Sequence, residues 1–417
     1  MACKPFLYGM YDIFMKKGIL FIGFFTIICS CNHRLPNQRW IEELLNTRTD
    51  STITLNVLSN VVNEYPLSKL IDSVRYVELD NSDEALLSHI RNIKIINDMI
   101  YVLDLNSRLK CFDSQGKFIR NAYNKGGGPE EISHFIDFDV DENNLYILDG
   151  AKVALFTFTH NGVFVSKQNL PFRAEAFKRV PDNKYLFRLS RFSDLKSKEE
   201  KAGDRIVLTD DKFTPIYSIL RAVEDSPLPL CVYPFFENRT KPKYFCDEMG
   251  YGLFEKRDTV LFMKYHLDFD GKYFNEDLEH YKFTDEEERY WATRSPLHNE
   301  DYILQAFYAG LQRTGTLLIR LKDNKIMFIK KLIQDRNDIL DFSILHTLGY
   351  DYATNEFYGT SNYLDLDAVV NEKDKDLIRQ KMSPEVQPFL LRQNIEVTTN
   401  CILMFYKLKQ NIEFPDE

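Results

Sequence analysis

Few cysteines, few tryptophans and no excess of basic residues characterise this sequence of 417 residues. The seven cysteines include no CxxC pair and no spacing typical of a zinc site. Acidic residues outnumber basic residues by 62 to 53, and the formal net charge is −9. Because nucleic-acid binding requires a basic surface, this balance argues against a nucleic-acid partner. No apolar run reaches the roughly 20 residues that a membrane-spanning helix needs.

Motifs for catalysis and for cofactor binding are also absent from the sequence. It has no GxSxG nucleophile elbow, and its histidines lack the HxH or HxxxH spacing that favours a metal. Four residues alternate as in a calcium loop, namely Asp137, Asp139, Asp141 and Asn143. However, Glu142 occupies the position where that loop requires glycine, so a turn is the preferred interpretation. The run Gly126–Gly128 lacks the lysine and the helix of a phosphate-binding loop. We therefore predict no metal, no cofactor and no catalytic residue.

The N-terminal segment has the features of an export signal. Lys16 and Lys17 precede the apolar run Ile19–Cys29, which is too short to span a bilayer. The sequence Ile28-Cys29-Ser30-Cys31 resembles the lipobox of bacterial lipoproteins, which implies cleavage before Cys31 and lipid attachment to that residue. An uncleaved anchor or an ordinary signal peptide is the alternative.

This interpretation divides the chain into three parts. Residues 1–30 are the predicted signal peptide, and residues 1–14 fit no signal region, so the start at Met1 is interpreted as mis-assigned in favour of Met15. Residues 31–50 are polar and are predicted to be a lipidated tether, and residues 51–417 form the folded domain. Asn32, rather than aspartate, follows Cys31. We therefore expect an outer-membrane lipoprotein that faces the periplasm or the cell surface.

Short β-rich runs separated by turn residues dominate the first half of the folded domain. Four predicted strands lie between Ile93 and Phe118, with Asn, Asp and Gly in the turns that connect them. Phe138–Phe164 repeats this pattern. Three pairs of positions correspond, namely Tyr101 with Tyr146, Asp104 with Asp149, and Gly116 with Gly162. The period of about 45 residues is typical of four-stranded propeller blades.

Weaker copies of the pattern continue to the end of the chain. Predicted strands include 184–189, 205–208, 213–219, 252–255, 259–262, 264–267, 316–321, 325–329, 356–360 and 397–407. Val74–Leu79 is predicted to supply the missing strand of the last blade, because closing the ring removes an unpaired sheet edge. Six blades fit this pattern best, although five or seven also agree with it.

A family resemblance supports the same architecture. The segments Gly126–Ile132, Phe138–Asp141 and Leu145–Asp149 look like an NHL-type repeat. The chain from Ile71–Leu79 to Phe405–Lys409 resembles the six-bladed propeller lipoproteins of Bacteroidetes. This resemblance implies an all-β fold with a single β-propeller of six four-stranded blades and short helical insertions. It assigns no activity.

Three helical insertions are predicted between the blade strands. A capping-box pattern opens one of them at Thr284, and this helix continues to about Thr293. The charged stretch Ala368–Lys381 is the second, and Ser383-Pro384-Glu385 begins the third.

One aromatic cluster is the candidate ligand site. Tyr233, Phe235 and Phe236 lie in a proline-rich stretch that we interpret as a loop, where binding residues gather. Packing between blades is the alternative role for the aromatic clusters of this chain. Cys231 and Cys246 are candidates for a disulfide in an oxidising compartment, with buried single thiols as the preferred alternative.

Two classes of function agree with these observations. The first is a lipid-anchored, extracytoplasmic binding or scaffolding propeller that recognises a glycan, a peptide or a protein partner. The second is an extracytoplasmic polysaccharide hydrolase or lyase with a site assembled from several blades. We favour the binding protein, because the sequence shows no catalytic constellation. A deep pocket with converging carboxylates would favour the enzyme instead.

Overall fold

The computed structural model describes residues 44–189, 204–221, 244–247, 250–257, 260–273, 289–292, 296–309, 313–340, 347–361, 376, 379–390 and 400–415. The predicted signal peptide, Cys31 and most of the predicted tether lie outside these residues. Cys231 and the candidate ligand residues Tyr233, Phe235 and Phe236 also lie outside them. Of the helices that the described residues form, none has the length and apolar character required to cross a membrane.

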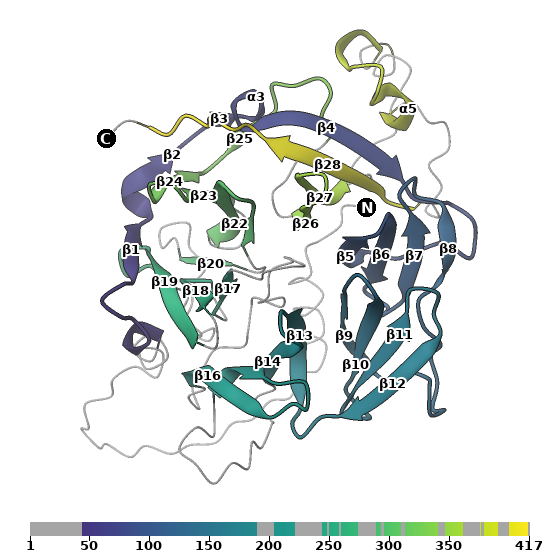
Figure 1. Cartoon of the computed structure of the whole chain (residues 1–417). Coiled ribbons are helices and arrows are strands. Elements are labelled where there is room, and N and C mark those ends of the chain that lie inside the picture. Colours follow the sequence, from purple (N-terminus) through teal and green to yellow (C-terminus); the bar gives the residue numbers. More distant parts are fainter. Residues whose placement is uncertain are drawn as a thin grey trace, which may run out of the picture.

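Six sheets are arranged around a central axis as the blades of a propeller (Figure 1). The first three blades are antiparallel sheets of four consecutive strands. Blade 1 comprises β5 (Ile90–Ile96), β6 (Met99–Asp104), β7 (Leu109–Asp113) and β8 (Phe118–Asn121). Blade 2 comprises β9 (Phe135–Val140), β10 (Asn144–Asp149), β11 (Ala154–Thr159) and β12 (Phe164–Asn169). Blade 3 comprises β13 (Ala174–Val180), β14 (Lys184–Leu189), β15 (Asp204–Thr209) and β16 (Pro215–Arg221).

The other three blades combine consecutive strands with one strand from the N-terminal part of the chain. Blade 4 comprises β17 (Tyr244–Cys246), β18 (Gly252–Arg257), β19 (Val260–Asp268) and β1 (Ile53–Asn56). Blade 5 comprises β20 (Tyr290–Ala292), β21 (Leu297–His298), β22 (Tyr302–Ala309), β23 (Arg313–Arg320), β24 (Lys325–Ile329) and β2 (Val61–Val62). Blade 6 comprises β26 (Thr347–Asp351), β27 (Glu356–Ser361), β28 (Ile402–Leu408) and β4 (Ile71–Glu78).

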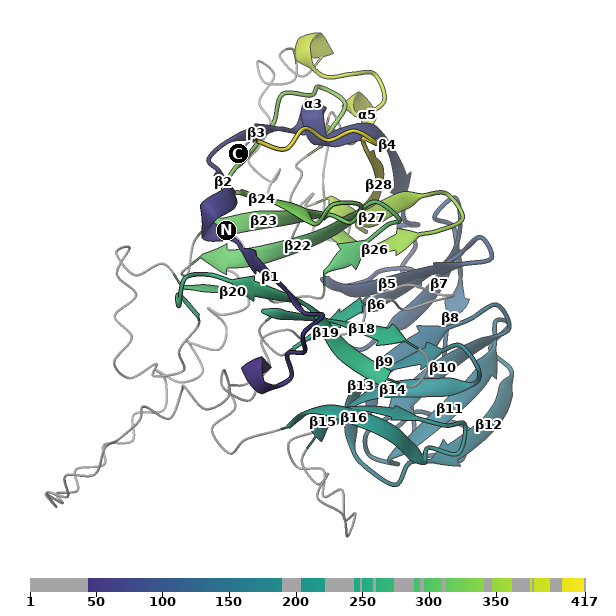
Figure 2. The same ribbon diagram turned by 60° about the vertical axis from the view of Figure 1, so that its left-hand side comes forward.

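We call residues 53–78 the belt, because their strands lie along the outer edges of three neighbouring blades (Figures 1 and 2). Strand β1 pairs in parallel with β19, and β2 pairs in parallel with β24. Strand β4 pairs antiparallel with β28, which closes the ring as predicted. Between these strands the belt also contains η2 (Leu58–Asn60), β3 (Tyr65–Pro66), which pairs with β25 (Leu332–Ile333), and α3 (Leu67–Leu70).

The blades pack through alternating faces of their strands. On β6, Ile100 and Val102 face the cluster shared with blade 6, whereas Tyr101 and Leu103 face the cluster shared with blade 2. This alternation is the two-residue period of a strand that is buried on both faces. Aromatic rings fill many of these interfaces, for example in the stacked pair of Tyr185 and Phe187. The hydrophobic core is therefore a ring of interfaces between blades.

Tight turns fix the repeat at the same places in successive blades. Gly116 and Gly162, predicted to correspond, each end the turn before the outermost strand, with φ of +84° and +81°. Glycine adopts this left-handed conformation without the penalty that a Cβ imposes. In blade 3 the equivalent position is Phe213, which adopts φ of +64°. The turn geometry is therefore retained even where the sequence signal is lost.

Asp104 and Asp149 are also equivalent, because both are buried at the end of the second strand of their blades. One oxygen of Asp104 accepts the backbone N–H of Ser88 at 3.0 Å. The matching oxygen of Asp149 accepts the N–H of Ser133 at 2.6 Å. The other oxygen of each carboxylate accepts N–H groups of its own following turn. Each aspartate therefore connects two loops of its blade.

Several predicted elements differ from those observed. The predicted strands 259–262 and 264–267 form the single strand β19. Residues Tyr290–Ala292, predicted to end a helix, form strand β20, because Tyr290 and Trp291 are buried in the blade interface while they pair with β22. The described part of the last predicted insertion contains a turn, and helix α5 begins at Gln387, four residues after Ser383 (Gln387–Leu390).

The described residues begin at Leu44, whose side chain is buried in the core cluster of blade 4. Cys246 lies in the same cluster and is fully buried. Since Cys231 is outside the described residues, both the preferred buried single thiols and the alternative disulfide stay untested predictions.

Candidate functional site

A buried charged cluster connects the innermost strands of blades 1, 2 and 3. Lys94 on β5 and Lys178 on β13 donate to the same oxygen of Asp139 on β9, at 3.0 and 2.9 Å. The second oxygen of Asp139 accepts the backbone N–H of Arg179 at 2.9 Å. All three charged side chains are almost completely buried. The cluster thus joins three blades through one carboxylate.

The two aspartates of β9 experience opposite electrostatic effects. Burial alone would raise the pKa of Asp139, but the ammonium groups of Lys178 and Lys94 outweigh it and lower the pKa to about 2. Burial raises the pKa of Asp137, whose oxygens accept the N–H groups of Phe177 and Phe138. Asp139 therefore serves as a permanent anion that neutralises two lysines. A glycosidase carboxylate needs access to its substrate, and this geometry does not provide it.

The sequence interpretation of this region is partly confirmed. Asp141 accepts the N–H groups of Asn143 and Asn144, which forms the predicted turn. Among the described residues, no group of three or more histidine, cysteine or acidic side chains is arranged to hold a metal. The histidine nearest this turn, His160, contacts the hydroxyl of Tyr101 and the carbonyl of Asp141, each at 2.8 Å. It therefore connects blade 1 to blade 2.

A polar groove lies where the ring closes, between blade 6 and blade 1. One wall is Arg75–Asn81, from β4 and the loop that follows it, and the other is Ser114–Lys117, the turn between β7 and β8. We call it the closure groove, and its volume is about 660 Å³. Asp80 donates its backbone N–H to the carbonyl of Gly116 at 2.8 Å, which holds the two walls together.

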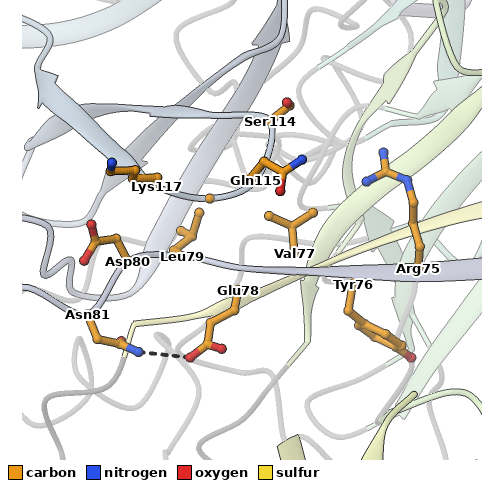
Figure 3. A pocket seen from close by; sticks show the side chains of 11 residues that line it. Arg75, Tyr76, Val77, Glu78, Leu79, Asp80, Asn81, Ser114, Gln115 and Lys117 are labelled. Carbon is orange, nitrogen blue, oxygen red and sulfur yellow. Dashed lines mark hydrogen bonds between the residues drawn. The ribbon is translucent and has the colours of Figure 1, made fainter. Parts of the chain in front are cut away.

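The side chains of the closure groove separate into two sets. Figure 3 shows Arg75 and Val77 projecting from β4 towards Gln115, whereas Tyr76 and Glu78 project to the opposite side. The guanidinium of Arg75 lies 3.8 Å over the ring of Phe405 and pairs with Glu356 at 2.6 Å. These contacts hold a side chain that remains substantially exposed, at 45%. Arg75 is therefore preorganised at the edge of the groove.

Asp80 gives the groove a fixed negative charge at its other end. Its carboxylate accepts the N–H groups of Ser82 at 2.8 Å and Phe118 at 3.3 Å, and the bond from Ser82 contributes most to lowering its pKa. Three side chains of the opposite wall, Ser114, Gln115 and Lys117, are exposed. The groove thus offers both hydrogen-bond donors and acceptors over a shallow surface. The sequence marked Gly116 as a repeated turn position but did not bring the two walls together, because more than 30 positions separate them.

Comparison with solved structures found, among others, one structure of the same fold and one of lower similarity. A presumed exported protein of Bacteroides fragilis shares the fold with a TM-score of 0.62 and 16% identity, and the match covers 86% of this chain and 99% of that chain. A member of the DUF4221 family from Bacteroides vulgatus gives a TM-score of 0.43 at 11% identity, over 82% of this chain and 97% of that chain.

Comparison with sequences identifies the family. The search of curated proteins found no match. The family described as Domain of unknown function (DUF4934) matches residues 51–407, which is most of the chain. The chain therefore belongs to the DUF4934 family.

Proposed function

We propose that this chain is a lipid-anchored extracytoplasmic protein that binds an extended polar ligand, a glycan or a peptide, on its propeller. The lipobox-like sequence Ile28–Cys31 supports lipid attachment to Cys31, and Asn32 after it supports an outer-membrane destination. The description of the Bacteroides fragilis structure as a presumed exported protein agrees with this location.

The closure groove is the observation that carries the binding role. It is shallow and polar, and its side chains include a cation that is held in place, a permanent anion and a carboxamide. Hydroxyl and amide groups both donate and accept hydrogen bonds, so ligands rich in them can use such mixed donors and acceptors. The buried carboxylates of β9 are instead committed to lysines and backbone N–H groups. This contrast favours binding over the alternative of a hydrolase or lyase.

The test uses the full-length chain in detergent and a panel of neutral oligosaccharides, acidic oligosaccharides and peptides. A ligand that binds only the folded chain at 100 times its dissociation constant stabilises it by about 2.7 kcal/mol, so a saturable rise of the thermal midpoint is expected with one class. Gln115→Ala and Lys117→Ala should weaken that binding. Lys212→Ala, on the equivalent turn of blade 3, is the control and should leave it unchanged.

Two results would contradict the proposal. The first is the absence of any shift across the panel. The second is breakdown of a bound oligosaccharide during incubation, which would favour the enzyme instead.

A further inference from the structure

The next seam of the ring is built in the same way as the closure groove but has different chemistry. There, the outermost strand β8 of blade 1 lies beside the turn Asn161-Gly162 of blade 2, just as β4 lies beside Ser114–Lys117. This second-seam groove has a volume of about 390 Å³ and is lined by 120–124, 128–131, Phe158, 161–162 and Phe164. The repeat has therefore placed two related grooves on either side of blade 1.

Aromatic rings form a rigid wall of the second-seam groove. Phe164 packs against Phe158 with ring centroids 5.9 Å apart, and against Phe156 at 6.4 Å. Tyr123 is stacked on Phe135 at 5.5 Å. Phe164 and Tyr123 are only partly buried, so part of each side chain remains at the surface. Aromatic faces present apolar area to a ligand with little loss of side-chain entropy, because their rings are already fixed.

The rim of the second-seam groove carries uncharged amides and one carboxylate. Asn121, Asn124, Asn161 and Glu130 are all exposed. The basic residue Arg120 is already engaged, since it donates to the carbonyls of Asn121 and His160. Carboxamides both donate and accept hydrogen bonds, as neighbouring hydroxyls of a sugar do. An anionic ligand would instead meet the carboxylate of Glu130 on the rim and that of Glu131 in the adjoining loop.

The loop that carries this rim is held in one conformation. The carboxylate of Glu131 accepts the N–H of Gly128 at 2.7 Å. The ammonium of Lys152 donates to the carbonyls of Gly128 at 2.5 Å and Glu131 at 2.7 Å. Residues Gly128–Glu131 thus form a fixed wall of the groove, which lowers the entropic cost of binding.

We infer that the second-seam groove binds one or two neutral sugar rings, with the apolar face of a ring on Phe164 and its hydroxyls on the asparagine rim. The inference rests on the proposed function and narrows its ligand to a glycan. Its size agrees, because ligand pockets begin at about 300 Å³. In the closure groove the aromatic lining residue is Tyr76, whose hydroxyl is bonded to the backbone of Asp338 and Leu340. That groove then contacts a different part of the ligand.

The experiment uses the full-length chain in detergent with methyl glycosides of glucose, galactose, mannose and N-acetylglucosamine and their linear disaccharides. Ligand-observed NMR with selective irradiation of protein aromatic protons reports saturation transfer to a bound sugar. We expect transfer to at least one of these probes. The double variant Asn121→Ala/Asn161→Ala should weaken binding of that probe about tenfold. Phe164→Leu should strongly reduce the saturation transfer to it, since Tyr123 and Phe158 remain in the groove.

Asn169→Ala, at the far end of β12, is the matched control and should bind normally, and the thermal midpoint of each variant verifies that it is folded. Binding that is unchanged in the asparagine and Phe164 variants but lost in Gln115→Ala would overturn the inference and leave the proposed function standing. Binding only of acidic oligosaccharides or peptides would likewise overturn the inference and leave the proposed function standing. If no member of either panel binds, both the inference and the proposed function fail.

Discussion

The two halves of the ring obtain their outermost strands in different ways. Blades 1–3 each take four strands from one continuous stretch of sequence. Blades 4–6 take their outer strands from the belt, and two of these strands pair in parallel. The first half also has the charged cluster of Lys94, Asp139 and Lys178 along its innermost strands. Local hairpins and a buried charge stabilise one half, whereas long-range strand addition stabilises the other.

The belt should account for the largest effect. Leu55 and Val57 are buried against blade 4. The double variant Leu55→Ala/Val57→Ala should lower the free energy of unfolding by about 4 to 6 kcal/mol, since both side chains leave cavities. Chemical denaturation measures the loss, and hydrogen exchange should locate it in β18 and β19. Val165→Ala, on the exposed outer strand of blade 2, should change stability by less than about 0.5 kcal/mol. Equal acceleration of exchange in blades 1 and 4 would refute this contrast.

The charged cluster should give the next largest effect. Asp139→Asn leaves Lys94 and Lys178 buried without their anion, so we expect a loss of about 3 to 5 kcal/mol at pH 7. Asp137→Asn should cost much less, because burial already favours the protonated form of that carboxyl. Urea denaturation of the two variants at equal pH makes the comparison. Similar losses of stability in both variants would contradict this prediction, because the loss would then not depend on the charge of the aspartate that was replaced.

The aspartates that connect loops should contribute less. Asp149 is fully buried and accepts N–H groups from both loops of blade 2. Asp149→Ala leaves these donors without an acceptor and should cost about 2 to 3 kcal/mol. Asp113→Ala removes a similar cap from an exposed turn and should cost about 1 kcal/mol or less. Thermal denaturation of both variants is the measurement, and a larger loss in Asp113→Ala would contradict our interpretation.

The pH dependence of stability should show the smallest effect. The pKa of Asp139 is about 2 in the folded chain, below its unfolded value of about 3.9. Its stabilisation is therefore complete above pH 3.9 and is lost as the pH falls towards 2, a change of roughly 2 kcal/mol. The pKa of Asp137 is raised, so its contribution has the opposite sign and is lost as the pH rises through its folded value. Denaturation between pH 2 and 5 should be less pH-dependent in Asp139→Asn than in the natural chain.

Sequence patterns predicted the fold best where the strands of a blade are consecutive. Lys184–Leu189 and Lys325–Ile329 were predicted with their observed limits. Strand β4 was predicted as Val74–Leu79 because the last blade lacked a strand that would close the ring, and it is observed as Ile71–Glu78. Strands β1 and β2 were missed, since four and two residues give too short a pattern to detect. Parallel pairing over more than 200 positions leaves no local signal at all.

The candidate grooves could not be predicted, because each joins a turn of one blade to a strand of the preceding blade. The clearest sequence signal near them was the pair Gly116 and Gly162, which marks the turn in both seams. Asp137 and Asp139 were noticed only as part of an alternating series that was interpreted as a turn. The lysine partners of Asp139 lie about 40 positions away in either direction. Only the repeat period relates such distant positions. The predicted residues Tyr233, Phe235 and Phe236 remain untested.

The pairing of β4 with β28 imposes an order on folding. Val77 and Leu403 are register partners although more than 300 positions separate them. The closing strand therefore has no partner until the chain has emerged almost completely, and such non-local pairing makes folding slow. During synthesis or export, the strands of the belt therefore stay unpaired while blades 1–3 form from local hairpins. A chain that ends before residue 402 lacks β28, so its ring should stay open. Completion of the whole propeller therefore depends on the last residues of the chain.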